Sequence, residues 1–442
     1  MKRLFIKTLG CQMNEYDTFK IYNMLNITHN LQLTNNTNNA NILILNTCSI
    51  RNKSQEKAFS EILKWKQIKN INKNIIIIIT GCLAVQEGNI LHKKFPFINI
   101  IVGPQTIHKI PELLNRVILD YNNKNLFIDL LFSKKEKFNY IPLQEKNISN
   151  YISISEGCNR YCTYCIVPYT RGKEIHREFN NIMTEILILS KRKIKEIILL
   201  GQNVNNYNGT INNIYKANLS LIIYYINEIK HIKRIKFITS HPSSLSNKII
   251  QLFSKINKLN NNLHLPIQSG SNKILNLMKR GYKEEDYKKK ILTLKKIRKN
   301  ITISTDIIVG FPEETHQDFL HTINVIHNIK FDKSYSFLYS KRLNTTASKK
   351  KDNINLFEKK ERLNIIQTLL NKYTSIISKQ MIKNTYNTLY LGKSKNNKYI
   401  ETKTENNRII KIINNTNKIK NTIKIMIIKS KNNLLKGKKL IQ

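Results

Sequence analysis

The chain has 442 residues, enough for about three domains with full-sized cores. Its 74 Lys and Arg residues against 29 Asp and Glu give a formal net charge of +45, which favours a polyanionic partner such as nucleic acid. The longest aliphatic run, Ile75–Ile79, is too short for a membrane span, and Lys7 interrupts the apolar start of the chain. We therefore expect a cytoplasmic protein with neither a membrane segment nor a secretory signal.

The positive charge has a second explanation. Ile, Asn and Lys crowd segments such as 70–75 and 415–420. All three residue types have A/T-rich codons, so a biased nucleotide composition would raise the charge without any selection for binding. Charge alone leaves both interpretations open.

The N-terminal region alternates strand-like and helix-like segments. Strands are expected at 4–8, 41–45 and 75–79, and helices at 17–25 and 55–69. Residues 119–145 carry few signals and are expected to form a linker with one strand. The alternation of strands and helices predicts a parallel α/β sheet.

Cys11, Cys48 and Cys82 each lie at, or just past, the end of one of these strands. In open parallel sheets, ligands bind beyond the carboxyl ends of the strands, so the three thiols could converge on one site. A single free cysteine beside a strand is usually just buried. Three cysteines at equivalent places favour a three-thiolate metal site.

From Tyr151 the pattern restarts with about six strand–helix repeats. Strands are expected at 151–155, 196–200, 234–239, 263–265, 301–309 and 332–339, with helices between them such as 272–280 and 284–299. A full or partial barrel fits this pattern, and its functional residues are expected at the rim formed by the carboxyl ends of the strands. His241 and His264 lie in strand-end segments, where a hydrogen-bonded structural histidine is the commoner case.

Directly after the first of these strands, three cysteines follow one another with the spacing C-x3-C-x2-C, at Cys158, Cys162 and Cys165. A structural zinc site needs four protein ligands, and a cubane iron–sulfur cluster usually takes four cysteines. With only three cysteines, one iron of a 4Fe-4S cluster would stay open to bind a small molecule. A zinc knuckle whose fourth ligand lies elsewhere, or cysteines that are merely buried, would also fit the spacing.

The last part of the chain begins with a helical region at 356–383. Short alternating segments then follow at 387–391, 399–400, 408–413 and 422–428. Such spaced strands predict a β-barrel of about 60 residues, and its many lysines suit an RNA-binding accessory domain.

These motifs together resemble the radical S-adenosylmethionine (SAM) methylthiotransferases, and within that family the MiaB type. The resemblance covers essentially the whole chain and is carried by KTLGCQMNE at 7–15, LNTCSIR at 45–51, GPQ at 103–105, EGCNRYCTYC at 156–165, VPYTRG at 167–172, LGQNV at 200–204, SHP at 240–242, LPIQSGS at 265–271 and TENNR at 404–408. Two motifs depart from the family pattern. Arg-Pro-Gly-Thr reads RLNT at 342–345, and Phe-Pro-Gly-Glu-Thr reads FPEET at 311–315, which concerns turn geometry near the substrate mouth.

The resemblance implies an α/β architecture in three parts. These are an N-terminal methylthiotransferase domain with a parallel sheet at 1–118, a radical SAM core with a partial (βα)6 TIM-like barrel at 144–375, and a small TRAM-like RNA-binding β-barrel at 378–442.

It also implies two 4Fe-4S clusters and SAM as cofactors. The catalytic cluster, whose open iron would bind SAM, would be held by Cys158, Cys162 and Cys165. The second cluster would deliver sulfur and would be held by Cys11, Cys48 and Cys82. The implied SAM contacts are Tyr164, Gln268 and Ser269, although simple packing accounts for Tyr164 equally well.

The implied reaction is methylthiolation at C2 of N6-isopentenyladenosine at position 37 of tRNA, with a second SAM donating the methyl group. The partners would be the tRNA anticodon stem-loop, a reductant and a sulfur source, and the enzyme would act as a monomer. Within the enzyme class, the alternatives are methylthiolation of N6-threonylcarbamoyladenosine in tRNA or of a ribosomal protein. Outside it, the alternative is a non-catalytic zinc or RNA-binding protein.

Overall fold

The computed structural model describes residues 2–49, 52–119, 126–131, 138, 148–394, 397–413, 422–431 and 433–440. Contacts divide the chain into two compact units, the first comprising 1–145, 155–161 and 165–177, and the second 146–154, 162–164 and 178–442. Most of the expected linker at 119–145 lies outside the described residues. None of the helices in the described part of the chain has the length and apolar character that a membrane span requires.

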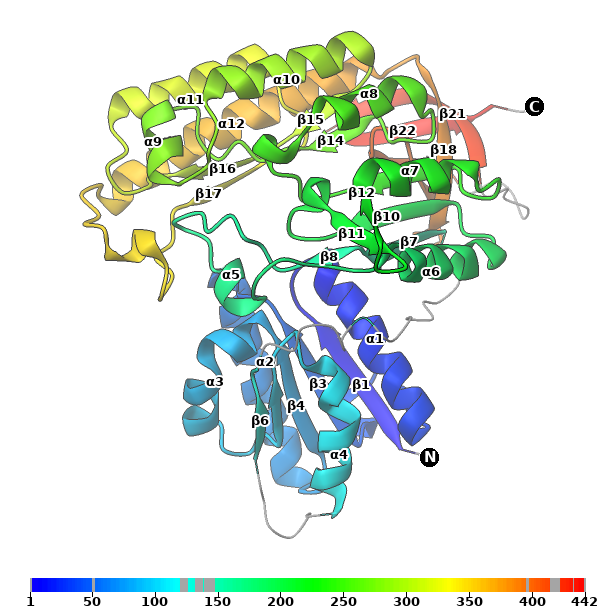
Figure 1. Ribbon diagram of the computed structural model, residues 1–442, viewed down its shortest axis with the longest axis vertical. Coiled ribbons are helices and arrows are strands. Elements are labelled where there is room, and N and C mark those ends of the chain that lie inside the picture. Colours follow the sequence, from blue (N-terminus) through cyan, green and yellow to red (C-terminus); the bar gives the residue numbers. More distant parts are fainter. Residues whose placement is uncertain are drawn as a thin grey trace. The chain divides into compact units, whose positions relative to one another are not determined.

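The first unit contains a six-stranded parallel sheet with helices on both of its faces (Figure 1). The strand order is β2-β1-β3-β4-β5-β6 and every neighbouring pair is parallel. The strands are β1 Arg3–Thr8, β2 Gln32–Leu33, β3 Ile42–Thr47, β4 Ile76–Gly81, β5 Ile100–Val102 and β6 Phe127–Asp129. The predicted parallel α/β sheet is confirmed, and its three predicted strands are β1, β3 and β4.

The sheet separates two apolar cores because side chains alternate between its faces with a period of two. In β3, Ile42 and Ile44 belong to one core, and Leu43 and Leu45 belong to the other. Since both faces are buried, the strands are continuous apolar runs rather than alternating ones.

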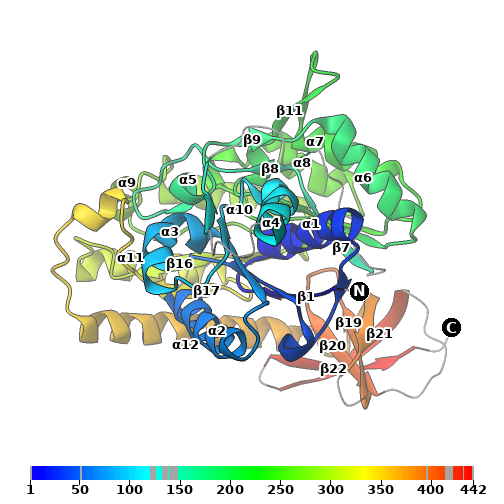
Figure 2. The same ribbon diagram turned by 90° about the horizontal axis from the view of Figure 1, so that it is seen from below.

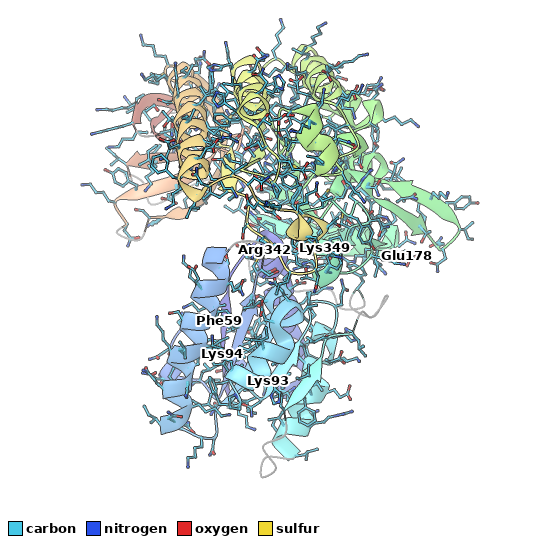
Figure 3. All side chains as sticks on the ribbon, turned by 90° about the vertical axis from the view of Figure 1, so that its left-hand side faces the viewer. Phe59, Lys93, Lys94, Glu178, Arg342 and Lys349 are labelled. Carbon is cyan, nitrogen blue, oxygen red and sulfur yellow. The ribbon has the colours of Figure 1, made fainter. Side chains whose placement is uncertain are left out.

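Two helices cover each core. The first core packs against α1 (Gln12–His29) and α4 (Ile110–Leu119), and the second packs against α2 (Asn52–Ile71) and α3 (Cys82–Lys94). Phe59 of α2 and Lys94 of α3 lie side by side (Figure 3), with the ammonium 5.1 Å from the centre of the ring. This cation–π contact joins the two helices over the second core.

The second unit begins with parallel strands that alternate with helices around one apolar core. The strands pair as β13-β10-β7, β14-β15 and β16-β17, all parallel. Their bounds are β7 Ser149–Ser153, β10 Glu196–Leu200, β13 Arg234–Phe237, β14 Asn262–His264, β15 Thr302–Ser304, β16 Asp306–Val309 and β17 Tyr335–Leu338. The helices between them are α6 Phe179–Lys191, α7 Leu219–Glu228, α8 Asn247–Lys255, α9 Asn272–Leu277, α10 Glu284–Ile297 and α11 His316–Ile329. This arrangement agrees with the predicted partial TIM-like barrel.

One predicted element of this region was wrong. The sequence predicted a single strand at 301–309, but β15 ends at Ser304 and β16 begins at Asp306. The intervening Thr305 is buried; its hydroxyl donates to the Leu265 carbonyl at 3.0 Å and accepts from the Ile267 amide at 2.8 Å. The strand changes its partner at this residue, pairing with β14 before it and with β17 after it.

The C-terminal strands close into a small barrel with the order β18-β19-β20-β22-β21, drawn in orange to red in Figure 2. They are β18 Thr385–Lys393, β19 Tyr399–Lys403, β20 Ile409–Ile413, β21 Thr422–Lys431 and β22 Leu434–Lys439, and α12 (Leu356–Gln380) precedes them. The barrel was predicted, but its last strand was not, because the sequence LLKGKK offers only two apolar side chains.

Buried ion pairs fix this barrel to the rest of the second unit. Arg408, within the TENNR motif, donates to both carboxylate oxygens of Asp332, and the two side chains are 0% and 1% exposed. Lys403 pairs with Glu196, which lies on β10. Breaking such buried pairs is costly, so they hold the barrel in one orientation on the strand–helix repeats.

The two departures from the family pattern lie at left-handed backbone positions. Glu313 has φ 70° and Asn344 has φ 68°, and both stand where the family motif has glycine. Asn adopts this conformation readily, whereas a Glu side chain carries a steric cost of about 1–2 kcal/mol. Figure 3 marks Arg342, at the start of the second of these turns. The turn geometry is therefore kept, and the cost falls on Glu313.

We predict that Glu313→Gly is more stable than Glu313→Ala by about 1 kcal/mol, because only Ala keeps the left-handed strain. Both variants lose the exposed ion pair to Lys350, so that loss cancels. Thermal unfolding followed by circular dichroism should place the Gly variant higher by about 2–4 °C.

The same pair of substitutions at Lys350, where φ is −75°, is the control. There Ala should be favoured over Gly by about 0.4–1 kcal/mol. A preference for Ala at both positions would contradict the assignment of strain to Glu313.

Candidate active site

Three cysteines lie along one edge of the sheet in the first unit. Cys11 is the N-cap of α1 after β1, Cys48 follows β3, and Cys82 begins α3 directly after β4. The strands are neighbours in register, with Thr8 opposite Asn46 and Thr47 opposite Gly81. The structure therefore places Cys11, Cys48 and Cys82 beyond the carboxyl ends of three adjacent parallel strands, where ligands bind in such sheets.

Local geometry brings these cysteines close together. Gly10 has φ 133°, and a Cβ there would stand 2.5 Å from Cβ of Cys48, so only glycine fits. Burial raises the pKa of the Cys11 thiol and the Arg171 guanidinium opposes this rise, whereas a thiolate at Cys82 would add to it. The residue before Cys11 thus packs on Cys48.

A buried guanidinium organises the same edge. Arg171, just after α5 (Val167–Thr170), is 3% exposed and donates to Glu156, to Oδ1 of Asn14 at 2.9 Å and to Asp17 at 3.2 Å. Oδ1 of Asn14 also accepts from the Cys11 thiol at 3.7 Å. Arg171 therefore joins the segment around Glu156 to the helix that begins beside Cys11.

Negative charges surround Arg171. Burial alone would lower its pKa, but the electrostatic influence of Cys82, Glu156 and Asp17 raises it well above its usual value. An arginine cannot give up its proton in a protein, so this position always carries a positive charge beside the thiols.

Backbone hydrogen bonds fix the start of the loop that carries Cys158, Cys162 and Cys165. Strands β8 (Ser155–Glu156) and β9 (Ile175–His176) pair antiparallel, and the Cys158 amide donates to the Gly172 carbonyl at 3.2 Å. Gly157 has φ 79°, and a Cβ there would collide with the carbonyl of Lys173. These contacts all lie in the first unit, to which Cys158 and Cys165 belong.

The middle of this loop, Cys162–Tyr164, packs within the second unit. The Thr163 amide donates to the Met278 carbonyl at 3.2 Å, and its hydroxyl donates to the Leu277 carbonyl at 2.9 Å. The half-buried Tyr164 packs against a small apolar cluster formed by Ile274, Met278, Phe311 and Ala347. Its hydroxyl accepts from Arg280 at 3.4 Å, so packing accounts for much of its surroundings.

Gln268 and Ser269, the other implied SAM contacts, differ in how much of their bonding capacity the fold uses. Gln268 has φ 74° and is 9% exposed, and its Oε1 has no hydrogen-bond partner among the described residues. The Ser269 hydroxyl is fully buried and accepts from the Ser271 amide at 3.2 Å. Gln268 therefore keeps an acceptor for a ligand, whereas the Ser269 hydroxyl already has a partner within the turn.

The two strand-end histidines have local partners. His264 lies 3.3 Å from an Asp306 oxygen and 3.1 Å from the Ser304 hydroxyl. Nδ1 of His241 accepts from the Ser243 amide at 3.2 Å and caps a short 3-10 helix. Both match the expected structural role.

The donor set fits iron–sulfur clusters by its chemistry. All six cysteines are free thiols, in two sets of three, and each set has a buried arginine beside it, Arg171 or Arg280. Within the described residues, no group of three or more His, Cys, Asp or Glu side chains is arranged to hold a single metal ion. The fit therefore rests on thiolate donors and compensating cations.

Two regions of the chain match known families. Residues 3–103 match the uncharacterized protein family UPF0004, and residues 152–326 match the radical SAM superfamily. The tRNA-2-methylthio-N(6)-dimethylallyladenosine synthase of Vesicomyosocius okutanii subsp. Calyptogena okutanii (strain HA) is 44% identical over 443 residues, covering 100% of both chains. The chain belongs to this family. The synthase of the same name from Francisella tularensis subsp. holarctica (strain LVS) is 43% identical over 438 residues, 99% of this chain and 98% of its own length.

Solved structures agree at the level of the fold. The radical S-adenosylmethionine methyltransferase TsrM from Kitasatospora setae superimposes with a TM-score of 0.58 at 10% identity, over 79% of this chain and 75% of its own. The cobalamin-dependent radical enzyme OxsB gives a TM-score of 0.52 at 13% identity, over 84% of this chain and 56% of its own. The radical SAM fold and the family predicted from the motifs are confirmed.

Two arginines at these sites had no role predicted from the sequence. Arg171 and its partner Glu156 stand inside recognised motifs, VPYTRG and EGCNRYCTYC, and that position was the available signal. Arg280 follows α9 outside every recognised motif. Nothing in its local sequence indicates that it reaches the cysteine loop.

We predict that Arg171→Met destabilises the first unit by about 3–5 kcal/mol, because Glu156 and Asp17 would each lose a buried ion-pair partner. Urea unfolding followed by the fluorescence of Trp65, which lies in the core of this unit, should report the loss. The free energy of unfolding of Arg171→Lys should lie between those of the wild-type protein and Arg171→Met, because one ammonium cannot reach all three acceptors.

Arg116→Met is the matched control. Its ion pair with Glu112 is 57% and 59% exposed, so its loss should cost about 0.5 kcal/mol or less. Equal destabilisation by the two Met variants would show that Arg171 does not hold this edge together.

Proposed function

We propose that this protein is a tRNA methylthiotransferase that converts N6-isopentenyladenosine at position 37 to its 2-methylthio derivative. The observation that carries the proposal is the 44% identity to named synthases of this activity across the entire chain. The motif cysteines support it, because one set of three lies at the carboxyl edge of a parallel sheet and the other forms the C-x3-C-x2-C loop.

Each set of three cysteines is proposed to hold one 4Fe-4S cluster, with SAM bound at the loop cluster. The clusters and SAM supply, when bound, the one-electron and sulfur-transfer chemistry that acid–base groups cannot provide at an adenine C2–H bond. The chain's own residues bind and orient these groups. Cys158, Cys162 and Cys165 would ligate the first cluster, and Cys11, Cys48 and Cys82 would ligate the second.

Gln268 is proposed to contact SAM directly. Its buried Oε1 can accept a hydrogen bond from an amino or hydroxyl group of the ligand, which would satisfy an atom that has no partner among the described residues. An unpaired buried acceptor costs about 1–3 kcal/mol, so ligand binding would recover this cost. Tyr164 offers an aromatic ring within the C-x3-C-x2-C loop, where SAM is proposed to bind.

The C-terminal barrel is proposed to bind the tRNA backbone. Buried isoleucines on β21 alternate with exposed residues, and six lysines of β21 and β22 are exposed: Lys424, Lys429, Lys431, Lys436, Lys438 and Lys439. The ammonium groups of Lys398 and Lys436 lie 6.0 Å and 5.8 Å from the centre of the Tyr399 ring. Lysines combined with an aromatic ring suit a single-stranded RNA loop, and binding should weaken steeply with salt.

The cytoplasmic location, the monomeric state and the domain boundaries at 1–118, 144–375 and 378–442 are part of this proposal. The reductant and the sulfur source would be separate proteins or small molecules.

The identity of the modified nucleoside can be tested in cells that lack the gene. We expect their tRNA to lose 2-methylthio-N6-isopentenyladenosine and to accumulate N6-isopentenyladenosine, as measured by nucleoside mass spectrometry, and the cloned gene should restore the modification. Retention of the 2-methylthio nucleoside would reject the proposal. Loss of methylthiolation on N6-threonylcarbamoyladenosine, or on a ribosomal protein, would instead support one of the rival methylthiotransferases.

The division of labour between the clusters predicts a selective defect. Anaerobically purified protein should contain about eight irons per chain, and Cys11→Ala should contain about four. The variant should still cleave SAM to 5′-deoxyadenosine but should form no methylthiolated product. Cys162→Ala is the converse control and should abolish SAM cleavage. Zinc without labile sulfide in the wild-type protein would favour the non-catalytic rival, and loss of SAM cleavage in Cys11→Ala would reject the division.

A further inference from the structure

Arg280 sits in a sharply bent turn within the second unit. It follows α9, and its two neighbours have left-handed backbones, with φ 53° at Lys279 and φ 67° at Gly281. The Arg280 side chain is 5% exposed. The bend directs a long cationic side chain into the protein rather than to solvent, where arginine is usually found.

Arg280 donates hydrogen bonds to two tyrosine hydroxyls, one backbone carbonyl and one cysteine thiol. Nε donates to the Tyr282 hydroxyl at 3.2 Å, and Nη2 donates to the Pro266 carbonyl at 2.9 Å. Nη1 donates to the Cys162 sulfur at 3.5 Å and to the Tyr164 hydroxyl at 3.4 Å. The Cys162 thiol is the only partner in this set that gains a full negative charge on binding a metal.

No carboxylate of the described residues pairs with Arg280. Three other buried arginines do have such partners: Arg171 pairs with Glu156, Arg362 with Glu314, and Arg408 with Asp332. A guanidinium stays charged at any ordinary pH, and a buried charge without a counter-ion is strongly destabilising. Negative charge on Cys162 would therefore supply the counter-charge that Arg280 lacks among the described residues.

We infer that Arg280 is a positioning residue for the cluster at the C-x3-C-x2-C loop, donating to the Cys162 sulfur and supplying the positive charge that raises the reduction potential of that cluster. This inference rests on the proposed function, because it requires a cluster on Cys162. Hydrogen bonds to ligand sulfurs and nearby charge are among the main means by which a protein sets the potential of an iron–sulfur cluster.

The surrounding contacts hold donor and acceptor together. Thr163, next to Cys162, is bonded through its amide and hydroxyl to the carbonyls of Met278 and Leu277, just before Arg280. On the other side, the Tyr282 hydroxyl donates to the Ile267 carbonyl at 2.7 Å and accepts from Arg280. The cysteine and the arginine are thus attached to the same turn, so their separation does not depend on flexible side chains alone.

The test uses the full-length chain carrying Cys11→Ala, Cys48→Ala and Cys82→Ala, so that only the loop cluster contributes to the signal. In this background, Arg280→Gln should retain about four irons and the fold. At the midpoint potential of the parent, the ratio of reduced to oxidised cluster should fall at least tenfold, equivalent to about 59 mV for one electron. The ratio is read by electron paramagnetic resonance during an anaerobic titration with a low-potential reductant. Arg280→Lys keeps the positive charge but lacks the planar guanidinium with its several donors, so the ratio should fall less in this variant.

Arg298→Gln is the control, because Arg298 also bonds backbone carbonyls, those of Phe253 and Ile256, but no thiol. It should leave the ratio unchanged. An unchanged ratio in Arg280→Gln with intact iron would overturn the role of Arg280 and leave the proposed function standing. A parent without iron and sulfide would reject the proposed function and this inference together.

If Arg280→Gln loses its iron, Arg280→Lys decides the question. Retention of iron by the Lys variant supports the need for positive charge. Loss of iron from a Lys variant with a native circular dichroism spectrum would mean that only the shape of arginine matters, and this would overturn the inference.

Discussion

The arrangement of the first unit depends on one buried guanidinium, that of Arg171. It binds two carboxylates and the Asn14 amide, and these groups come from positions as far as 157 residues away in the chain. Asn14 in turn donates to the carbonyls of Leu9 and Thr47, beside Cys11 and Cys48. One cation is thus the shared partner of two buried acids, and it fixes the segments that carry the thiols. Without it, the buried acids at the carboxyl edge of the sheet would lose a counter-charge just where the thiolates of the proposed cluster would form.

The sequence predicts the position of the thiols because strand ends follow local rules. Cys11, Cys48 and Cys82 could be placed on one edge from the apolar runs before them, since carboxyl ends of parallel strands share an edge. The roles of Arg171 and Arg280 could not be predicted in this way. Arg280 meets Cys162 across 118 residues, and only tertiary packing decides which of many arginines reaches a cysteine. The motifs indicate which segments matter, but not which of their side chains touch.

Local chemistry also explains where the element predictions fail. The strand at 301–309 was predicted as one because its apolar residues are continuous, and a buried threonine that switches partners gives no signal of its own. The strand β22 was missed because four of its six residues are glycine or lysine. At Glu313 the residue type changes and the structure does not: Glu replaces the glycine of the family motif, yet the left-handed backbone remains. There the surrounding fold overrides the local preference, at the expense of stability.

The two buried arginines differ in what neutralises them, and this difference matches the two kinds of work proposed for the clusters. Arg171 is paired with Glu156 and Asp17, so two buried carboxylates offset its charge. Arg280 has no such partner among the described residues, so its field acts on Cys162 without cancellation. A cluster that must accept an electron gains from an uncompensated cation, because reduction adds negative charge. A cluster that carries sulfur needs a fixed position more than a raised potential. Arg171, with its paired carboxylates and several hydrogen bonds, holds the surrounding segments in place.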